Sequence, residues 1–198
     1  AGGALFIECP DAEQNPFDLL TADHALHFSR STLAATMNRA GVRVDLSEKP
    51  WIAKELSAVC KATDGPPSGG KPGPTAARSV DPKEAIAQTR RNLAWLRTLL
   101  TQARTLAARE PIGCFGTSIA GTWLAGELED RIGFFVDEDP DRVGSNYLGR
   151  AVDQPDRVRS GSTVLLALAP SVARDVEARL APQFPKVRFV APEPVPAV

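Results

Sequence analysis

The sequence is poor in the side chains that most often carry metal or redox chemistry. Its 198 residues include two histidines, three cysteines and one methionine. The cysteines, Cys9, Cys60 and Cys114, are far apart and lack the short spacings of a zinc site. Each lies in an apolar, strand-like context, which is typical of small buried residues in a reducing cytoplasm. We therefore expect a cytoplasmic protein without a bound metal.

Long apolar runs and net charge are lacking as well. No run approaches the roughly 20 apolar residues of a membrane-spanning helix, and no basic start leads into an apolar stretch as in a signal peptide. The formal net charge of −1 gives no general attraction to nucleic acid or to an anionic membrane. At 43% hydrophobic and 24% charged residues, the composition is that of a globular protein. We expect neither a nucleic-acid partner nor a membrane span.

Glycine and proline are abundant in only one stretch, which divides the chain. Residues 64–74 hold four glycines and four prolines in eleven positions, too many for a helix or strand. We predict a unit at 1–63, a linker at 64–80, a long helix at 81–109 and a domain at 110–198. The helix opens with Asp81, Pro82 and Glu84 in a capping-box pattern. Its expected apolar stripe consists of Ile86, Leu93, Leu96, Leu100, Ala103 and Ala107.

Apolar patterning predicts an α/β fold. The first unit should contain a buried strand of a parallel or mixed sheet at 4–9, a loop at 10–28, a helix from Ser29 or Ser31 to Gly41, and strands at 42–46 and 52–60. The last domain should contain strands at 112–115, 132–136, 164–168 and 187–190, and helices at 118–128 and 171–180. Such alternation is typical of a small Rossmann-like parallel sheet with helices on its faces.

The turn between residues 113 and 121 is a candidate phosphate site. It follows a predicted strand and opens a helix, where backbone N–H groups can surround a phosphate. Its glycines, Gly113, Gly116 and Gly121, do not form the G-x-G-x-x-G fingerprint, and no lysine follows them as in a phosphate-binding loop of ATPases. A nucleotide-binding turn and a plain tight turn both fit this pattern.

An acidic residue ends the next predicted strand. Asp137 lies about 20 positions after the glycines, where Rossmann-type domains hold ribose hydroxyls. A solvated acidic turn explains Glu138, Asp139 and Asp141 fully. For Asp137 a solvated turn and a ribose contact are equally well supported.

Both histidines, His24 and His27, lie three residues apart before the first predicted helix. Histidine is the side chain best suited to proton transfer near neutral pH, and a neighbouring carboxylate such as Asp23 would raise its basicity and fix its tautomer. A histidine that caps the helix or packs in the loop is the simpler interpretation.

Several motifs resemble those of one enzyme family. Gly2-Gly3-Ala-Leu-Phe-Ile-Glu8-Cys-Pro10-Asp11, then Asp23-His24, His27-Phe28-Ser29 and Ala40-Gly41-Val42, are similar to the C-terminal end of a class I S-adenosylmethionine-dependent methyltransferase domain. The second part resembles the C-terminal Rossmann-like domain of sugar C-methyltransferases. It shares the glycine turn, the segment from Val136-Asp137 through Pro140 to Gly144, and Gly149 to Val152.

The resemblance implies a partial methyltransferase sheet, a linker, a long helix and a Rossmann-like domain. It implies that His24, assisted by Asp23, removes a proton from a sugar carbon next to a keto group, and that His27 packs at a usually aromatic position. Glu8 and Asp11 would line the substrate pocket. The residues implied near a nucleotide-linked sugar are Gly116, Thr117, Ser118 and Asp137. Thr21 stands where the family often has tyrosine, so C- and O-methylation both remain open.

The family binds S-adenosylmethionine at an N-terminal glycine-rich loop that would precede Ala1. We therefore expect the C-terminal portion of an enzyme, inactive alone and partnered by the missing N-terminal methyltransferase portion. One alternative is a non-catalytic Rossmann-like module that binds a nucleotide or nucleotide-sugar. An NAD(P)-linked oxidoreductase is disfavoured, because the glycine fingerprint is broken and Tyr147 is followed four residues on by Ala151 rather than lysine.

Overall fold

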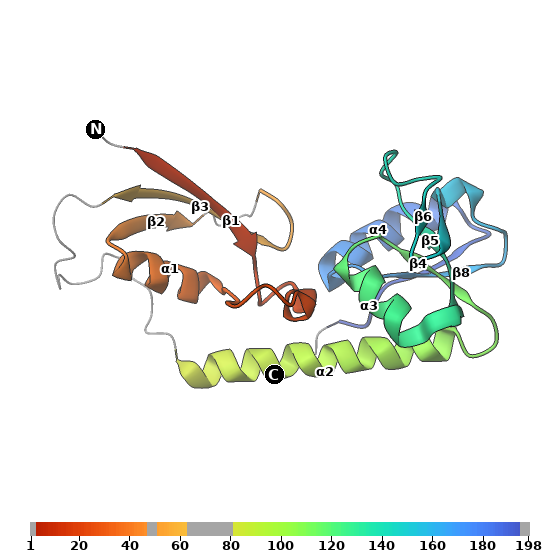
Figure 1. Cartoon of the computed structure of the whole chain (residues 1–198), viewed down its shortest axis with the longest axis horizontal. Coiled ribbons are helices and arrows are strands. Elements are labelled where there is room, and N and C mark those ends of the chain that lie inside the picture. Colours follow the sequence, from red (N-terminus) through yellow and green to blue (C-terminus); the bar gives the residue numbers. More distant parts are fainter. Residues whose placement is uncertain (1–2, 47–50, 63–80, 195–198) are drawn as a thin grey trace. The chain divides into compact units, whose positions relative to one another are not determined.

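The computed structural model describes residues 3–46, 51–62 and 81–194 of an α/β protein (Figure 1). The chain forms two compact units, Ala1–Arg90 and Arg91–Val198. The boundary falls within the long helix α2 (Pro82–Leu106), so this helix contributes to both units. The predicted linker, residues 64–80, lies outside the described residues. No helix in the described ranges has both the length and the apolar character needed to cross a membrane.

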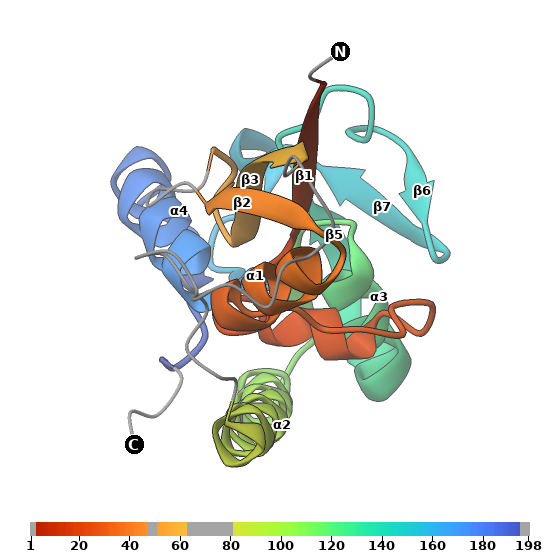
Figure 2. The same ribbon diagram turned by 90° about the vertical axis from the view of Figure 1, so that its left-hand side faces the viewer.

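The first unit is built on a three-stranded antiparallel sheet. Its elements are β1 (Ala4–Pro10), the 3-10 helix η1 (Pro16–Leu20), α1 (Arg30–Arg39), β2 (Val42–Leu46) and β3 (Glu55–Ala62). β3 is the central strand, in the order β1-β3-β2, and α1 contacts β2 (Figure 2). Leu56, Ala58 and Cys60 alternate along β3 and are buried. Ser29 and Thr32 form the capping box that starts α1.

The prediction of a buried parallel or mixed strand at residues 4–9 is wrong in both respects. β1 pairs only with β3 among the described strands, and this pairing is antiparallel. Leu5 and Phe6 are 52% and 50% exposed. An apolar run predicts a strand but does not show what covers it, and here Leu5 and Phe6 remain largely exposed within the described residues.

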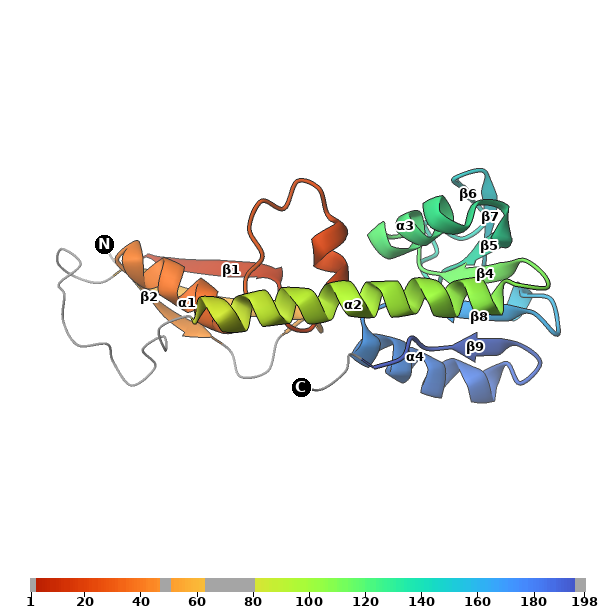
Figure 3. The same cartoon turned by 90° about the horizontal axis from the view of Figure 1, so that it is seen from below.

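The second unit is a mostly parallel sheet of six strands. Its elements are α2, β4 (Ile112–Phe115), α3 (Ile119–Leu128), η2 (Glu129–Arg131), β5 (Ile132–Val136), β6 (Asn146–Tyr147), β7 (Arg150–Asp153), η3 (Pro155–Arg157), β8 (Thr163–Leu166), α4 (Pro170–Gln183) and β9 (Arg188–Val190). The strand order is β6-β7-β5-β4-β8-β9, as the labels in Figure 3 run from one edge of the sheet to the other. Only β6 is antiparallel to its neighbour. The predicted Rossmann-like parallel sheet is therefore confirmed.

The chain extends the sheet on both sides of β4. α3 joins β4 to β5 on one side, whereas β8 pairs with β4 on the other side and continues through α4 to β9. In open parallel sheets a crevice forms outside the carboxyl ends of the strands where the order reverses in this way. This rule places the expected crevice beyond Phe115 of β4 and Leu166 of β8.

Helix α2 buries only part of the predicted stripe, since Leu96, Ala103 and Ala107 are buried as expected. Leu93 is 47% exposed and Ile86 is 52% exposed, whereas Trp95 and Leu99 are almost fully buried. The indole Nε1 of Trp95 donates a hydrogen bond to the backbone oxygen of Glu193 at 2.6 Å. A large aromatic ring that also satisfies its polar group is the better anchor, so the buried face is rotated towards Trp95.

Two glycines allow the close contact between β4 and α3. Gly116 has a φ of +94°, which a residue with a side chain rarely adopts. A Cβ atom at Gly121 would lie 2.3 Å from the backbone oxygen of Gly116. The tight turn after β4 therefore requires glycine at both positions.

We predict that Gly121→Ala destabilises the protein by about 1–3 kcal/mol, because the new methyl group meets a backbone oxygen that cannot move aside. Gly126→Ala in the same helix is the matched control. A Cβ there meets nothing within 4 Å, so removing helical glycine should stabilise by up to about 1 kcal/mol. Chemical denaturation of both variants measures the difference. Equal stabilities would contradict the close contact.

Candidate functional site

The turn after β4 and the end of β5 are joined by hydrogen bonds at the carboxyl edge of the parallel sheet. Asp137 is 9% exposed. Its Oδ2 accepts hydrogen bonds from the backbone nitrogen of Thr117 at 3.2 Å and from Thr117 Oγ1 at 2.9 Å. Its Oδ1 accepts a hydrogen bond from the backbone nitrogen of Asp139 at 3.1 Å. Two of the predicted site residues, Thr117 and Asp137, are thus in direct contact.

Arg142 completes this cluster and was not predicted. Its Nη1 donates to Thr117 Oγ1 at 3.0 Å and lies 3.5 Å from Asp137 Oδ2. Its Nε lies 3.2 Å from Asp139 Oδ2, so Asp139 is an ion-pair partner rather than only a solvated turn residue. The three-residue spacing of Asp139 and Arg142 was the available signal, but a spacing of this kind is common on surfaces.

The electrostatics of Asp137 favour a permanent carboxylate. Burial raises its pKa, but the hydrogen bonds from Asp139 and Thr117 and the charge of Arg142 outweigh burial, so the pKa lies below its ordinary value of 3.8. A carboxylate offers about four acceptor positions, and three are taken by the protein's own donors.

This arrangement does not fit a ribose-binding acidic residue. In the dinucleotide fingerprint the carboxylate accepts hydrogen bonds from ribose hydroxyls, whereas Asp137 fixes the turn of its own chain. The edge of the second unit therefore does not fit S-adenosylmethionine or a nicotinamide dinucleotide held in that way. Ser118 is exposed and begins α3 without a side-chain capping bond, so it is the predicted site residue that is open to a ligand.

We predict that Asp137→Asn lowers the free energy of unfolding by about 1.5–3 kcal/mol at neutral pH, as for hydrogen bonds to a charged group. Because the folded pKa is depressed, the stabilisation is present above 3.8 and is lost as the pH falls through the folded value. Wild type and variant should therefore converge at acidic pH. Urea denaturation across this range is the measurement, with exposed Asp141→Asn as control. A difference independent of pH would contradict the charged network.

The two histidines of the first unit are held by one buried carboxylate. The side chain of Asp18, in η1, is 3% exposed. His24 Nδ1 lies 2.7 Å from Asp18 Oδ1, and His27 Nδ1 lies 2.5 Å from Asp18 Oδ2. The imidazole side chains are 38% and 31% exposed. Because a carboxylate only accepts hydrogen bonds, each ring carries its proton on Nδ1 and keeps Nε2 for other partners.

The partner of His24 is therefore Asp18 rather than Asp23. The hydrogen bond to Asp18 raises the pKa of His24 above 6.5 against the opposing effect of burial, and the charges of Asp18, Asp23 and Glu55 add to the rise. Asp23 is exposed and acts on His24 only through its charge. The expectation that His27 packs at a usually aromatic position also fails, since its imidazole is partly exposed and hydrogen bonded to Asp18.

Asp18 was not predicted as a site residue, because it precedes its partners His24 and His27 by six and nine residues. The available signal was a carboxylate inside the apolar segment Pro16-Phe17-Asp18-Leu19-Leu20. A buried acidic residue must be paired, and its partners come from the loop that η1 turns back towards it.

Asp11 and Glu8 have structural contacts of their own. The carboxylate of Asp11 accepts hydrogen bonds from the backbone nitrogen of Glu13 and from Gln14 Nε2, and burial raises its pKa. Glu8 Oε1 accepts a hydrogen bond from Ser57 Oγ at 3.0 Å. Neither residue has a described contact with His24, and the role of both at a substrate pocket stays a prediction.

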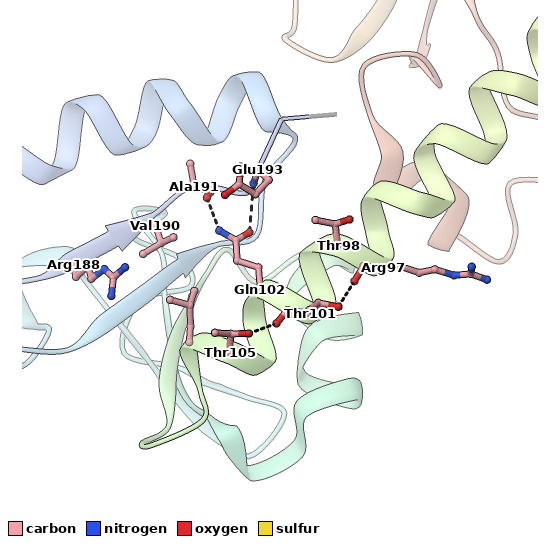
Figure 4. Close-up of a pocket in the computed structure, with 10 residues that line it drawn as sticks. Arg97, Thr98, Thr101, Gln102, Thr105, Arg188, Val190, Ala191 and Glu193 are labelled. Carbon is pink, nitrogen blue, oxygen red and sulfur yellow. Dashed lines mark hydrogen bonds between the residues drawn. The ribbon is translucent and has the colours of Figure 1, made fainter. Parts of the chain in front are cut away.

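A surface pocket of about 670 Å³ lies between α2 and the end of β9 in the second unit (Figure 4). Thr98, Thr101 and Thr105 donate their hydroxyl protons to the preceding helical turn. Gln102 Nε2 donates to the backbone oxygen of Ala191 at 3.2 Å. None of the predicted site residues lines this pocket, its threonine hydroxyls bond within α2 itself, and Gln102 docks α2 on the segment after β9.

Comparisons do not identify a family: no protein-family model and no curated protein matches the chain. Within the described residues, no group of three histidine, cysteine, aspartate or glutamate side chains is arranged to hold a metal. The candidate sites for chemistry and binding are therefore the Asp18–His24–His27 cluster and the carboxyl edge of the parallel sheet.

Proposed function

We propose that the chain is the C-terminal part of a cytoplasmic S-adenosylmethionine-dependent methyltransferase that acts on a sugar or nucleotide-linked sugar. His24 is its general base. The observation that carries this proposal is the 2.7 Å contact between His24 Nδ1 and the buried carboxylate of Asp18. It gives the histidine of the methyltransferase-like motif an orienting partner and an available Nε2.

The contact suits a histidine that accepts a proton from carbon. Asp18 fixes the tautomer, so that the lone pair on Nε2 is the one available to a substrate. The same carboxylate stabilises the imidazolium that forms, as the acidic member of a catalytic triad does. A raised pKa makes His24 a stronger base, and its neutral fraction decreases as the pH falls through that value.

The first unit also has a surface suited to the rest of a methyltransferase sheet. β1 is an edge strand within the described residues, and its Leu5 and Phe6 are exposed. Trp51 stacks on Phe6 with ring centroids 4.9 Å apart, which enlarges this apolar surface. Exposed apolar strand edges favour pairing with further strands. In the proposal the N-terminal methyltransferase portion covers this edge and supplies the methyl-donor site.

The proposed role of the second unit is to hold the nucleotide-linked sugar at the carboxyl edge of its sheet. Gly116 and Ser118 border the crevice where the strand order reverses, and α3 begins there with backbone N–H groups that favour a phosphate. A binding module without chemistry of its own is the second candidate, because this crevice needs no contribution from the histidines.

We expect the intact protein to exchange the proton next to the keto group of a nucleoside diphosphate-linked keto sugar with deuterium from the solvent. His24→Asn retains an amide donor near Nδ1 but removes Nε2. It should slow the exchange by about 10²–10⁴-fold, the usual contribution of a general base. Proton NMR follows the exchange.

Asp23→Asn is the matched control, since Asp23 is the neighbouring carboxylate that does not contact the ring. It should change the rate only severalfold. Normal exchange in His24→Asn would overturn the assignment of the base, and an inactive wild type would overturn the keto-sugar chemistry.

Nucleotide-sugar binding can be measured on the chain itself. Ser118→Trp fills the space before α3, so it should weaken the binding of a nucleoside diphosphate sugar by at least about tenfold in calorimetry, or about 1.4 kcal/mol. Ser160→Trp, before β8 at the opposite edge of the sheet, is the control and should bind normally. Equal affinities of the two variants would show that the ligand does not bind at this edge. Nucleotide-sugar binding without any proton exchange by the wild type would favour the binding module without chemistry.

A further inference from the structure

The pocket between α2 and β9 consists of residues that neither candidate site uses. It is formed by the part of α2 from Arg97 onwards and by β9 with the segment that follows it (Figure 4). Its volume of about 670 Å³ is in the range of pockets that bind small organic molecules. The side chains that line it therefore indicate which ligand it could bind.

The alternation of side chains along β9 directs Arg188 and Val190 towards α2. Phe189, which lies between them in the strand, packs on the opposite face of the sheet in the same apolar core as Leu180 of α4. Arg188 and Val190 both line the pocket. Figure 4 shows Arg188 beside Val190 at one end, whereas the side chain of Arg97 extends away from the other lining residues. The cationic end of the pocket is therefore at Arg188.

The guanidinium group of Arg188 is available to a ligand. Within residues 3–46, 51–62 and 81–194 it forms no ion pair and no hydrogen bond. Its five N–H donors form a planar fork that matches the oxygens of a phosphate or carboxylate. The pocket lining includes two arginines and one glutamate, and its net charge is therefore +1. These charges favour an anionic group at Arg188.

The wall contributed by α2 offers hydrogen-bond acceptors. Thr98, Thr101 and Thr105 lie on one side of the helix, at spacings of three and four residues. Each hydroxyl donates its proton to the backbone oxygen four residues earlier, at 3.2, 3.0 and 2.9 Å respectively. A hydroxyl oxygen that has donated its proton in this way still accepts hydrogen bonds through its lone pairs. This wall therefore suits a ligand with O–H donors.

The rest of the lining is apolar or already hydrogen bonded. Gln102 Nε2 donates to the backbone oxygen of Ala191 at 3.2 Å, and Gln102 Oε1 accepts from the backbone nitrogen of Glu193 at 3.4 Å. Leu106 and Val190 add apolar surface. A sugar ring has a C–H surface as well as hydroxyl groups, so it matches both the apolar and the accepting parts of the lining.

We propose that this pocket binds a sugar phosphate, with its phosphate on Arg188 and its hydroxyls on the threonine oxygens of α2. The inference goes beyond the proposed function and does not depend on it. The N–H groups of Arg188 donate to the phosphate in a charge-assisted pair, and the sugar hydroxyls donate to Thr98, Thr101 and Thr105. Inorganic phosphate can make only the first set of contacts, and an uncharged sugar only the second.

Binding is measured on the chain itself by calorimetry and NMR titration with glucose 6-phosphate, inorganic phosphate and glucose. We expect glucose 6-phosphate to bind at least about tenfold more tightly than either of the other two, because it makes both sets of hydrogen bonds. The amide signals of residues 98–105 and 188–191 should shift together. Equal affinities for glucose 6-phosphate and inorganic phosphate, no saturable binding, or shifts confined to the start of α3 would overturn the inference.

The phosphate contact is tested by Arg188→Gln, which should weaken the binding of glucose 6-phosphate by at least about tenfold, as for a charge-assisted hydrogen bond. Arg131→Gln is the matched control with the same change in charge. Arg131 is exposed and precedes β5, which β4 and β8 separate from β9. The control should bind normally. Equal affinities of the two variants would contradict a phosphate at Arg188.

The sugar contact is tested by Thr101→Val, which retains the shape of the side chain and removes its oxygen. It should weaken the binding of glucose 6-phosphate by about threefold or more and leave that of inorganic phosphate unchanged. This variant keeps Arg188, so it tests the pocket even if Arg188→Gln fails to fold. An unchanged affinity for glucose 6-phosphate would overturn the assignment of the threonine wall.

Ser118→Trp separates this pocket from the carboxyl edge of the sheet. It should weaken the binding of the nucleoside diphosphate sugar and leave that of glucose 6-phosphate unchanged, whereas Arg188→Gln should do the reverse. If Ser118→Trp weakens both ligands and Arg188→Gln weakens neither, this inference fails and the proposed role of the edge remains. If glucose 6-phosphate binds as expected and Ser118→Trp retains the nucleoside diphosphate sugar, the proposed role of the edge fails alone.

Discussion

The need to pair a buried carboxylate organises the loops of both units. An ionised carboxyl group that leaves water must gain hydrogen bonds or a counter-charge. Asp18 obtains them from two imidazoles, Asp137 from a threonine and a backbone nitrogen, and Asp11 from its own loop. In each case the chain outside the helices and strands is positioned around the anion. The irregular segments that bear the candidate site residues therefore have defined conformations.

The partners of each carboxylate decide what the site can do. Thr117 and the backbone nitrogen of Asp139 do not titrate near neutral pH, so the Asp137 cluster is permanently charged and holds the turn before α3 in place. The partners of Asp18 are the only two histidines of the sequence. Histidine is the side chain best suited to proton transfer near neutral pH, and this makes the Asp18 cluster the stronger candidate for chemistry. A buried carboxylate therefore stabilises a turn in the second unit and orients two histidines in the first.

The sequence predicted those features that depend on neighbouring residues. The capping pattern at Asp81 located the start of α2, and the glycines at 116 and 121 located the tight turn, because both signals are local. Other features depend on residues that are not adjacent in the sequence. These are the covering of β1, the face of α2 that is buried with Trp95, and the carboxylate that binds His24. Asp23 was the natural partner by proximity in sequence, but the turn at η1 brings Asp18 to the imidazole instead. Hydrophobic pattern and adjacency contain no information about such a reversal.

The spacing of Asp18, His24 and His27 is itself informative once the reason for it is known. A 3-10 helix places Asp18 at the start of a loop long enough to return, and three residues then separate two rings that reach opposite oxygens of one carboxylate. Replacing His27 by an aromatic residue without a donor would leave one oxygen of a buried carboxylate unpaired, which is unfavourable by about 1–3 kcal/mol. A chain with that replacement needs another donor for the second oxygen. We therefore expect the residues at positions 18 and 27 to covary among related sequences, because each needs the other as a hydrogen-bond partner.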